Sequence, residues 1–295
     1  MAKIHLPKSI KRFKDWSRHI RRLHLVLPLW WRNRMSRQPI VHIGGPAVSL
    51  TTYGTRTRRV YLAIESIGRG HLRPSTVTLW LDEAAVFNQL PLELQRLVQR
   101  GLTVRLTPNY GPHKKYYPQV TSDAGGARLP LVTADDDTLY PAHWLATLYA
   151  AHTREPGLVH CWRAKRIQTT PNGIAPYNQW PDCADNHASH AHFAIGCSGV
   201  IYPPRLQAAL AAAGDGFMQV CPKADDLWLH LHSLRNGFKV RQIQQRAVDF
   251  PCIPGTESVG LVNFNVNENG NDLQLLATYS ADDISAVLAA ARTGP

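Results

Sequence analysis

The sequence predicts an α/β fold with a mainly parallel central sheet and helices on both of its faces. Apolar segments of strand length alternate with segments of helical character from about residue 46 onward, as in chains that connect parallel strands through helices. With 295 residues, the chain is long enough for one large domain of this class. The sequence contains neither an internal repeat nor a glycine-rich phosphate loop, so the prediction depends on the order of the elements.

The first half of the chain alternates regularly. The second strand-like run closes at Asp82, and the helix before Gly101 ends at a residue that commonly terminates helices. In order, the predicted elements are a strand at 47–52, a helix at 60–67, a strand at 76–81, a helix at 92–100, and strands at 102–107 and 129–133.

The second half is less regular. Pro141 suits the first turn of a helix, whereas the stretch after residue 169 is rich in Pro, Asn and His and has no clear period. The predicted elements are a helix at 141–151, strands at 158–162 and 193–202, helices at 206–213 and 225–235, and a strand at 238–243.

Basic residues are concentrated at the N-terminus. Residues 1–37 contain eleven Lys or Arg residues and a single acid, Asp15, so they carry +10 of the net charge of +12. The rest of the chain is nearly neutral. We therefore predict a basic leader over residues 1–40 and a single domain over residues 41–295.

The leader has the pattern of an amphipathic helix, with large apolar residues every three or four positions and basic residues between them. These apolar residues are Ile10, Phe13, Trp16, Ile20, Leu23 and Leu27. No apolar run reaches the about 18–20 residues that a spanning helix needs, and no secretory cleavage site follows cleanly. The pattern favours an anionic membrane surface over the two alternatives, a nucleic-acid-binding arm and a helix packed on its own domain.

The five cysteines favour a reducing compartment. Their number is odd, their spacing is wide and no C-x-x-C pair occurs, which argues against a disulfide framework or a zinc site. They are Cys161, Cys183, Cys197, Cys221 and Cys252. Together with the leader, they predict a cytoplasmic protein, peripheral at the inner face of the cell membrane, with no nucleic-acid partner.

Three consecutive aspartates, Asp135, Asp136 and Asp137, follow the predicted strand at 129–133. Open α/β folds hold their ligands at this edge of the sheet, and adjacent carboxylates repel each other unless a cation or hydrogen bonds compensate them. Carboxylate oxygens suit Mg²⁺ or Mn²⁺, ions that commonly also bind substrate phosphates. The alternative is an acidic N-cap for the next helix, and the trio alone does not decide between the two.

A second acidic pair, Asp225 and Asp226, lies where a helix is predicted to begin after Pro222. The helix dipole and free amides favour the charged carboxylate, the form that a general base needs. An N-cap is again the alternative. Two acidic clusters at the edges of one α/β sheet raise the prospect of a shared site.

The sequence resembles GT-A-type, nucleotide-sugar-dependent glycosyltransferases, in particular bacterial family 2 enzymes and transferases of capsule and lipopolysaccharide synthesis. Five stretches over residues 45–280 carry the resemblance, and the leader lies outside it. They are VSLTTY at 48–53 with Arg56, YGPHKKY at 110–116, TADDD at 133–137 with Tyr140 and Pro141, GCSGVIYPP at 196–204, and ADDLW at 224–228.

The resemblance implies a GT-A-like fold and a site for a nucleotide sugar, most commonly a UDP-sugar, with a glycan or lipid-linked acceptor. Asp135 and Asp137 correspond to the D-x-D pair that contacts Mn²⁺ or Mg²⁺ and the donor, and Asp136 takes either part. Asp226 is the first choice for the base that deprotonates the acceptor, and Asp225 is the second. Direct displacement with inversion is the expected course, although retaining enzymes share the fold.

The remaining implied roles are divided between donor and acceptor. The donor-side residues are Thr52, Tyr53, Arg56, Asp82, Lys114 and Lys115. Among them, Tyr53 is expected to stack on the base and Asp82 to accept a base N–H. The two lysines are expected to face the diphosphate. Gly199 and Trp228 are placed on the acceptor side. Each has an ordinary alternative: a core aromatic, a capping aspartate or an exposed basic turn.

Some features depart from the pattern. The usual base motif has Glu before Asp, whereas both residues here are Asp. The segment with His187, His190 and His192 predicts a mobile polar acceptor loop rather than a metal site, because its spacing fits no common motif. Asn271-Asp272 resembles a stretch of related bacterial sequences but has no assigned role.

Two other classes of function were weighed against a glycosyltransferase. A metal-dependent phosphatase of the haloacid-dehalogenase type also has a strand that ends in Asp-x-Asp, but Leu139 stands where that motif has Thr or Val. A non-catalytic membrane- or nucleic-acid-binding protein would leave the aspartate trio and the Lys114-Lys115 pair unexplained.

Overall fold

The computed structural model describes residues 24–122, 128–171, 173–256 and 269–292. The strands are β1 (Ala47–Thr51), β2 (Thr76–Leu81), β3 (Leu102–Leu106), β4 (Leu131–Thr133), β5 (Val159–Cys161), β6 (Ala164–Arg166), β7 (Thr169–Thr170), β8 (Gly173–Ile174), β9 (Ala188–Ser189), β10 (His192–Ala194), β11 (Val200–Tyr202) and β12 (Val240–Gln242). A helix over residues 24–35 precedes them.

The other α-helices are α2 (Val60–Gly68), α3 (Ala84–Asn88), α4 (Leu92–Val98), α5 (Tyr117–Ser122), α6 (Trp144–Arg154), α7 (Pro204–Ala212), α8 (Phe217–Val220), α9 (Asp225–Arg235), α10 (Gly270–Thr278) and α11 (Ala281–Arg292). Short 3-10 helices are η1 (Gly54–Arg58), η2 (Gly111–Lys115), η3 (Tyr177–Gln179) and η4 (Gly196–Ser198).

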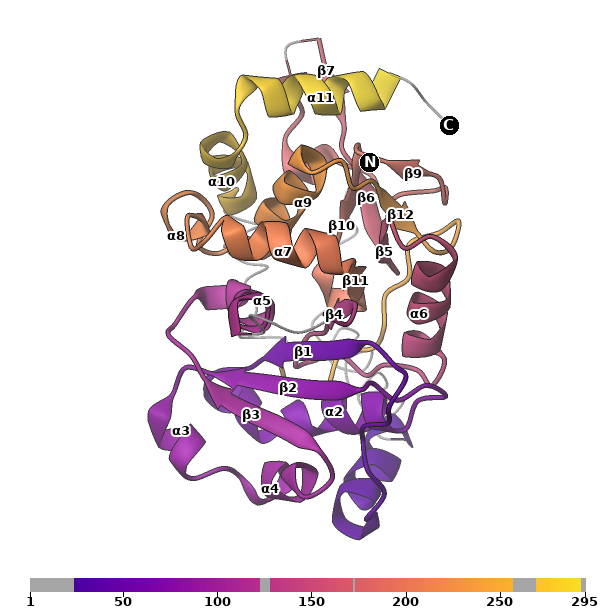
Figure 1. Ribbon diagram of the computed structural model, residues 1–295, viewed down its shortest axis with the longest axis vertical. Helices are drawn as coiled ribbons and strands as arrows, with labels where there is room; N and C mark the ends of the chain where they lie inside the picture. Colours follow the sequence, from indigo (N-terminus) through magenta and orange to yellow (C-terminus); the bar gives the residue numbers. More distant parts are fainter. Residues whose placement is uncertain (1–23, 123–127, 172, 257–268, 293–295) are drawn as a thin grey trace, which may run out of the picture.

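The prediction of an α/β fold with a mainly parallel sheet is confirmed. Eight strands form the central sheet in the order β3-β2-β1-β4-β11-β5-β12-β9 (Figure 1). The pairs β3-β2, β2-β1, β1-β4 and β5-β12 are parallel, whereas β11 runs antiparallel to both of its neighbours and β9 to β12. Figure 1 shows β1–β3 with α3 and α4 at one end of the molecule, and α7 and α9–α11 toward the other.

Alternate residues of the central strands enter two separate cores, one on each face of the sheet. In β1, Val48 and Leu50 pack with residues of α2, α4 and α6, whereas Ala47 packs with residues of α5, α7 and α9. Val132 and Leu131 of β4 divide between the two cores in the same way. Because the side chains of a strand point alternately to its two faces, this division explains the helices on both sides of the sheet.

The strand predicted at 193–202 is interrupted, and this expectation was wrong. β10 pairs with β6 in a separate sheet, η4 follows, and β11 then enters the main sheet. Gly199 makes the break, since its φ of 95° favours glycine and an added Cβ would lie 2.6 Å from the Trp144 indole. The helix expected from Pro141 begins three residues later, at Trp144. The apolar residues on both sides of Gly196, Ser198 and Gly199 favoured one continuous strand and concealed the turn.

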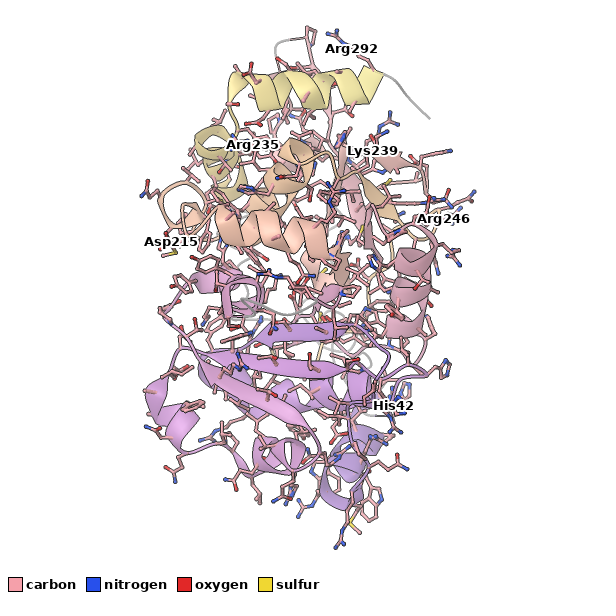
Figure 2. All side chains as sticks on the ribbon, viewed as in Figure 1. His42, Asp215, Arg235, Lys239, Arg246 and Arg292 are labelled. Carbon is pink, nitrogen blue, oxygen red and sulfur yellow. The ribbon has the colours of Figure 1, made fainter. Side chains whose placement is uncertain are left out.

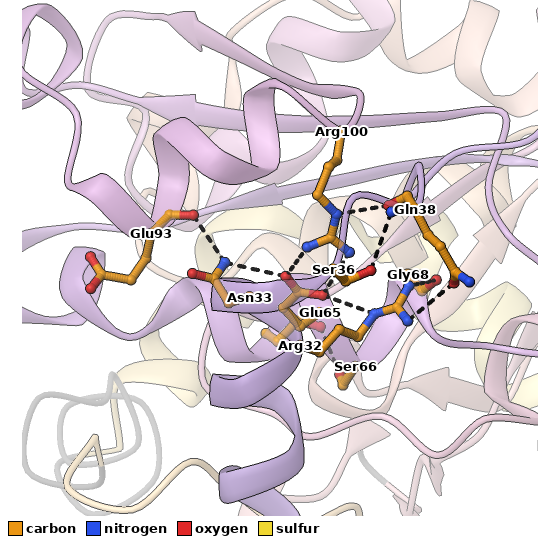
Figure 3. Close-up of polar contacts among 10 residues, drawn as sticks. Arg32, Asn33, Ser36, Gln38, Glu65, Ser66, Gly68, Glu93 and Arg100 are labelled. Carbon is orange, nitrogen blue, oxygen red and sulfur yellow. Dashed lines mark hydrogen bonds and ion pairs between the residues drawn. The ribbon is translucent and has the colours of Figure 1, made fainter.

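The C-terminal part of the predicted leader is packed into the domain. Leu29 and Ile40 are fully buried. Glu65 of α2, also fully buried, accepts hydrogen bonds from Arg32 Nε at 3.1 Å, Asn33 Nδ2 at 3.2 Å and Arg100 Nη2 at 3.1 Å (Figure 3). Arg32 therefore helps to neutralise a buried carboxylate of the domain and Asn33 donates a hydrogen bond to it, roles that the sequence did not suggest.

The leader helix also has an exposed apolar face. Leu27, Trp31 and Met35 have exposed fractions of 57%, 58% and 62%, and Trp30 of 39%. The apolar residues expected at positions 10, 13, 16, 20 and 23 lie outside the described residues. Within the described part of the chain, no helix is both long and apolar enough to span a bilayer.

Candidate active site

The acidic trio Asp135–Asp137 follows the carboxyl end of β4, beside the carboxyl end of β1. The two strands are parallel with Ser49 opposite Thr133, so Thr52 and Asp136 also meet just beyond the strands. Thr52 Oγ1 donates to Asp136 Oδ2 at 2.6 Å, and Asp136 is only 5% exposed. The register of the sheet thus brings two of the predicted donor-side residues into contact.

Arg56 of η1 pairs with two of the three aspartates. Its guanidinium donates to Asp136 Oδ1 at 2.9 Å and lies 3.0 Å from Asp137 Oδ2. It also donates to the Thr256 carbonyl at 3.1 Å, and the Ile253 N–H donates to the Asp137 carbonyl at 2.6 Å. The trio is therefore fixed between the end of β1 and the segment at 251–256.

Asp135 and Asp137 are the two members of the trio that remain partly open. Their side chains are 28% and 19% exposed, against 6% for Asp136. Burial and repulsion by Asp135 raise the pKa of Asp137 to about 6, although Arg56 opposes the shift. Two partly open carboxylates that repel each other fit a hard divalent cation, whereas both oxygens of Asp136 are already bonded.

The two lysines of η2 point in different directions, because a 3-10 helix turns by about 120° per residue. Lys114 Nζ lies 2.7 Å from Asp82 Oδ1, at the end of β2. Lys115 Nζ lies 3.3 Å from Asp135 Oδ1 and 2.9 Å from Asp225 Oδ2. Burial alone would lower the pKa of Lys115, but the surrounding carboxylates raise it well above its usual value. Lys115 therefore stays charged and joins the two acidic clusters.

Asp225 and Asp226 begin α9, as predicted. Asp226 Oδ2 accepts a hydrogen bond from the Gly196 N–H at 3.2 Å, and Oδ1 has no hydrogen-bond partner among the described residues. Asp226 borders a small, mostly apolar cavity beside Leu229 and Tyr202. Burial and repulsion by Asp225 raise the pKa of Asp226 to about 7. A carboxyl group that titrates near neutral pH and has a free lone pair has the properties of a general base.

Three positioning residues were not singled out from the sequence. His113 stacks on Phe217 at 3.9 Å between ring centroids, and its Nε2 lies 2.8 Å from the Cys221 carbonyl, which holds η2 against α8 and its C-terminal end. Tyr140 Oη accepts the Asp135 N–H at 2.8 Å. At Gly196, an added Cβ would lie 2.6 Å from Lys115 Nζ and 2.9 Å from Asp226 Oδ1.

These three residues lie within or beside the motifs quoted above. The sequence provides no signal that separates a side chain holding a site together from an ordinary core residue. Burial lowers the pKa of His113 to about 4, so its imidazole is neutral and serves as a hydrogen-bonding spacer.

Other predicted residues lie apart from the acidic clusters. Trp228 is 8% exposed and packs against Phe217 and His232, so most of its surface lies in the core. Gly199 is required by the Trp144 contact described above. Tyr53 is half-buried beside Arg56, with the guanidinium carbon 5.8 Å from the ring centroid.

The histidine-rich segment and the tail do not reach the aspartates. The His190 carbonyl lies 3.0 Å from Nε2 of His230, whose Nδ1 lies 2.6 Å from the Tyr279 hydroxyl. His230 therefore lies between the β9–β10 connection and the end of α10, and it also lines the cavity that Asp226 borders. In the tail, Asp272 accepts the Tyr177 N–H at 2.6 Å, and Asn271 is buried.

The assembled cluster has more acids than cations. It contains the six carboxylates of Asp82, Asp135, Asp136, Asp137, Asp225 and Asp226 and the three cations of Arg56, Lys114 and Lys115. With all groups ionised, this leaves an excess of three negative charges. Such a site repels an anionic ligand unless a cation binds with it.

No protein-family model matches the chain, and no curated protein matches it. Among solved structures, the chain is similar to the mannosyltransferase PcManGT from Pyrobaculum calidifontis, solved in complex with GDP-Man and Mn²⁺. The likeness covers 95% of this chain and 86% of that one, with 14% sequence identity and a TM-score of 0.49. An identity and a TM-score this low establish neither a family nor an activity for the present chain.

Proposed function

We propose that the protein is a glycosyltransferase that moves a sugar from a nucleoside diphosphate donor to a hydroxyl group of a glycan or lipid-linked acceptor. The observation that carries the proposal is the contact of Lys115 with both Asp135 and Asp225. Lys115 thus lies between Asp135 of the partly open pair and the start of α9, where Asp226 has a pKa of about 7. Sugar transfer from a diphosphate needs these two functions, leaving-group stabilisation and a base, side by side.

The proposal includes a divalent cation, Mn²⁺ or Mg²⁺, because the cluster has more carboxylates than cationic side chains. Asp135 and Asp137 would hold it, since both are partly open and Asp136 is fully hydrogen-bonded. When bound, the ion would neutralise the negative charge that a leaving nucleoside diphosphate gains. Thr52, Tyr53 and Asp82 lie at the same ends of β1 and β2 and would contact the nucleoside part of the donor.

The chain's own residues supply the rest of the reaction. The donor diphosphate would bind the cationic side chains of Arg56, Lys114 and Lys115, which would then interact with it as well as with the carboxylates. Asp226 would accept the proton of the acceptor hydroxyl while the oxygen attacks the anomeric carbon and the sugar–phosphate bond breaks. Attack from the side opposite the diphosphate gives inversion. A UDP-sugar donor and a role in cell-surface polysaccharide synthesis are the corresponding proposals for substrate and pathway class.

Donor hydrolysis tests the proposal. We expect the full chain with Mn²⁺ to release nucleoside diphosphate from one member of a panel of UDP- and GDP-sugars. Asp137→Ala should lower the rate by about 10²–10³-fold, the usual cost of removing one electrostatic contact to the transition state. Chelation with EDTA should abolish release.

Asp215→Ala is the matched control, because Asp215 is an exposed aspartate outside the cluster (Figure 2). It should keep the wild-type rate. If no nucleotide sugar is hydrolysed with either metal, the proposal fails. Phosphate release from simple phosphomonoesters, lost in Asp137→Ala, would instead support the phosphatase alternative.

We further propose that the leader binds an anionic membrane surface and places the protein at the inner face of the cell membrane. The exposed face with Trp30, Trp31 and Met35 supports this proposal, as do the eight basic residues in the first 23 positions. Arg34 lies 4.8 Å over the Trp30 ring, so basic and aromatic groups share this face. Such a combination is suited to the headgroup region of an anionic bilayer.

The membrane proposal is tested by sedimentation with phosphatidylglycerol vesicles. Each basic residue near such a surface contributes about 1 kcal/mol, so deleting residues 1–23 should weaken binding by more than about 10-fold. The double variant Trp30→Ser/Trp31→Ser should also weaken binding, while donor hydrolysis is largely kept. Deleting residues 1–37 is a poorer test, because it removes Arg32 and Asn33 from the buried Glu65.

Leu273→Ser/Leu276→Ser is the matched control, since these two exposed leucines lie on α10, far along the chain from the leader. The control should bind vesicles as the wild type does. Undiminished sedimentation of the chain without residues 1–23 would show that the leader is not the membrane contact.

A further inference from the structure

A second group of potential ligands lies next to β9, the strand at one edge of the central sheet. Cys183 and His192 are buried and Asp185 is partly exposed, and one ligand atom from each lies within 4.8 Å of the other two. Cys183 Sγ is 3.5 Å from His192 Nε2, and Asp185 Oδ1 is also 3.5 Å from that nitrogen. The three side chains therefore converge on one point.

The distances match those between the ligands of a tetrahedral ion. Zinc binds sulfur at about 2.3 Å and nitrogen at about 2.0–2.1 Å, which separates the two ligand atoms by about 3.5 Å at the tetrahedral angle. A good hydrogen bond to a carboxylate would be about 2.7–2.9 Å, clearly shorter than the His192–Asp185 distance. The His192–Asp185 distance thus fits a shared ion better than a direct hydrogen bond, and the Cys183 thiol, which donates to the Asp185 carbonyl at 3.4 Å, would lose its proton when it binds the ion.

The arrangement does not fit a Cys-His-Asp catalytic triad. In a triad, the nucleophile and the carboxylate use different nitrogens of the imidazole. Here Cys183 and Asp185 both face Nε2 of His192.

We propose that Cys183, Asp185 and His192 bind one zinc ion, with His187 or water in the fourth position. A thiolate, an imidazole and a carboxylate are the ligands zinc prefers, whereas Mg²⁺ and Mn²⁺ avoid sulfur. His187 Nδ1 lies 3.5 Å from Asp185 Oδ1, and its side chain is 63% exposed, so it can turn toward the ion. The sequence argument against zinc considered the spacing of cysteines and did not consider a mixed ligand set.

The surrounding contacts give the ion a structural role. Gln242 Nε2 donates to the Cys183 carbonyl at 3.2 Å, and Gln242 is fully buried in β12. The His190 carbonyl is within hydrogen-bonding distance of His230 on α9, the helix that begins with Asp225 and Asp226. Zinc would therefore fix the 183–192 segment between the edge of the sheet and α9.

Cobalt substitution and zinc titration test the site. The full chain, stripped of metal with EDTA and desalted, should bind one Zn²⁺ tightly in competition with a chromophoric chelator. Co²⁺ should give the near-ultraviolet absorption of a cobalt–thiolate bond, which the carboxylates of the acidic trio cannot produce. Cys183→Ser and His192→Gln should weaken zinc binding by more than the about 10–100-fold that loss of an outer-shell partner costs.

Matched controls separate this site from the rest of the chain. Cys252→Ser and Asp182→Asn alter residues outside the group and should keep both zinc binding and the cobalt band. Asp137→Ala should also keep them, which makes the result independent of the proposed transferase activity. Absence of the cobalt–thiolate band in the unmutated chain would overturn the proposal. This test does not depend on whether any variant folds. Equal zinc binding by Cys183→Ser with a native circular dichroism spectrum would do the same.

Discussion

Asp226→Asn is expected to lower the rate of sugar transfer by about 10²–10⁴-fold, the usual contribution of a general base. An amide cannot accept the acceptor proton, but it has nearly the shape of the carboxylate and can still accept the Gly196 N–H bond. The affinity for nucleotide should therefore remain, since Asp226 lies at the start of α9 and not in the trio that we propose to hold the donor. Transfer rates and nucleotide titration, measured on the same preparation, separate the two effects.

The pH profile of the wild type gives a second test. The pKa of Asp226 is about 7, so the fraction in the basic form, and with it kcat/KM, should rise as the pH increases through about 7. Repulsion by Asp225 contributes to this pKa. Asp225→Asn should therefore move the rise to lower pH.

The stability of the folded chain should fall over the pH range in which its activity rises. The folded-state pKa of Asp226 lies above that of an unfolded aspartate, so between pH 4 and about 7 the folded chain binds a proton that the unfolded chain does not. The stabilising effect of this proton is present at low pH and is lost as the pH rises through about 7. Asp226→Asn, which never ionises, should therefore melt higher than the wild type at pH 8 and close to it at pH 4.

A loss of activity together with a gain in stability above pH 7 would distinguish a base from a merely structural residue. Asp215→Asn, at the surface, should change neither quantity. If Asp226→Asn transfers sugar normally while Asp225→Asn does not, Asp225 is the base.

The sequence predicted the frame of the site because that frame depends on local patterns. The apolar runs that form β1, β2 and β4 end in Thr52, Asp82 and the aspartate trio, and parallel strands align their carboxyl ends. The start of α9 at Asp225 was likewise visible from its acidic residues after Pro222. These predictions required no knowledge of which distant residues touch.

The remaining features depend on contacts between distant segments, which no local pattern encodes. The motif of Trp228 does not reveal that its ring packs against Phe217 and His232. The turn at Gly199 exists because the Trp144 ring occupies the space of a side chain. Glu65 gave no sign that it would receive hydrogen bonds from the leader helix.

Lys115 has the largest expected effect on stability. Its ammonium group is the shared partner of Asp135 and Asp225, with Asp226 nearby, and its side chain is 8% exposed. Replacing one partner of a buried ion pair leaves the other charge uncompensated and costs about 3–5 kcal/mol. Lys115→Met should lower the free energy of unfolding by that amount at pH 8, as measured by urea denaturation, and should abolish transfer.

The loss should depend on pH in a direction that identifies its cause. Without the lysine, nothing offsets the repulsion between Asp225 and Asp226, so the pKa of Asp226 rises further and its carboxylate takes up a proton at neutral pH. Protonation relieves the repulsion, and the deficit of Lys115→Met relative to the wild type should therefore shrink as the pH falls from 8 to 5. A loss caused only by altered packing would stay constant over this range.

Two lysine variants complete the comparison. Lys239→Met removes an exposed lysine (Figure 2) and should change stability by less than about 0.5 kcal/mol. Lys114→Met removes a buried lysine that pairs with Asp82, so it should destabilise the chain but leave the contact between the two acidic clusters intact. If Lys115→Met and Lys114→Met lose the same stability with the same pH dependence, Lys115 does not join the clusters. A larger, pH-dependent loss confined to Lys115→Met would instead show that this ammonium group allows the two acidic clusters to lie side by side. The contacts of Lys115 would then be needed for folding as well as for catalysis.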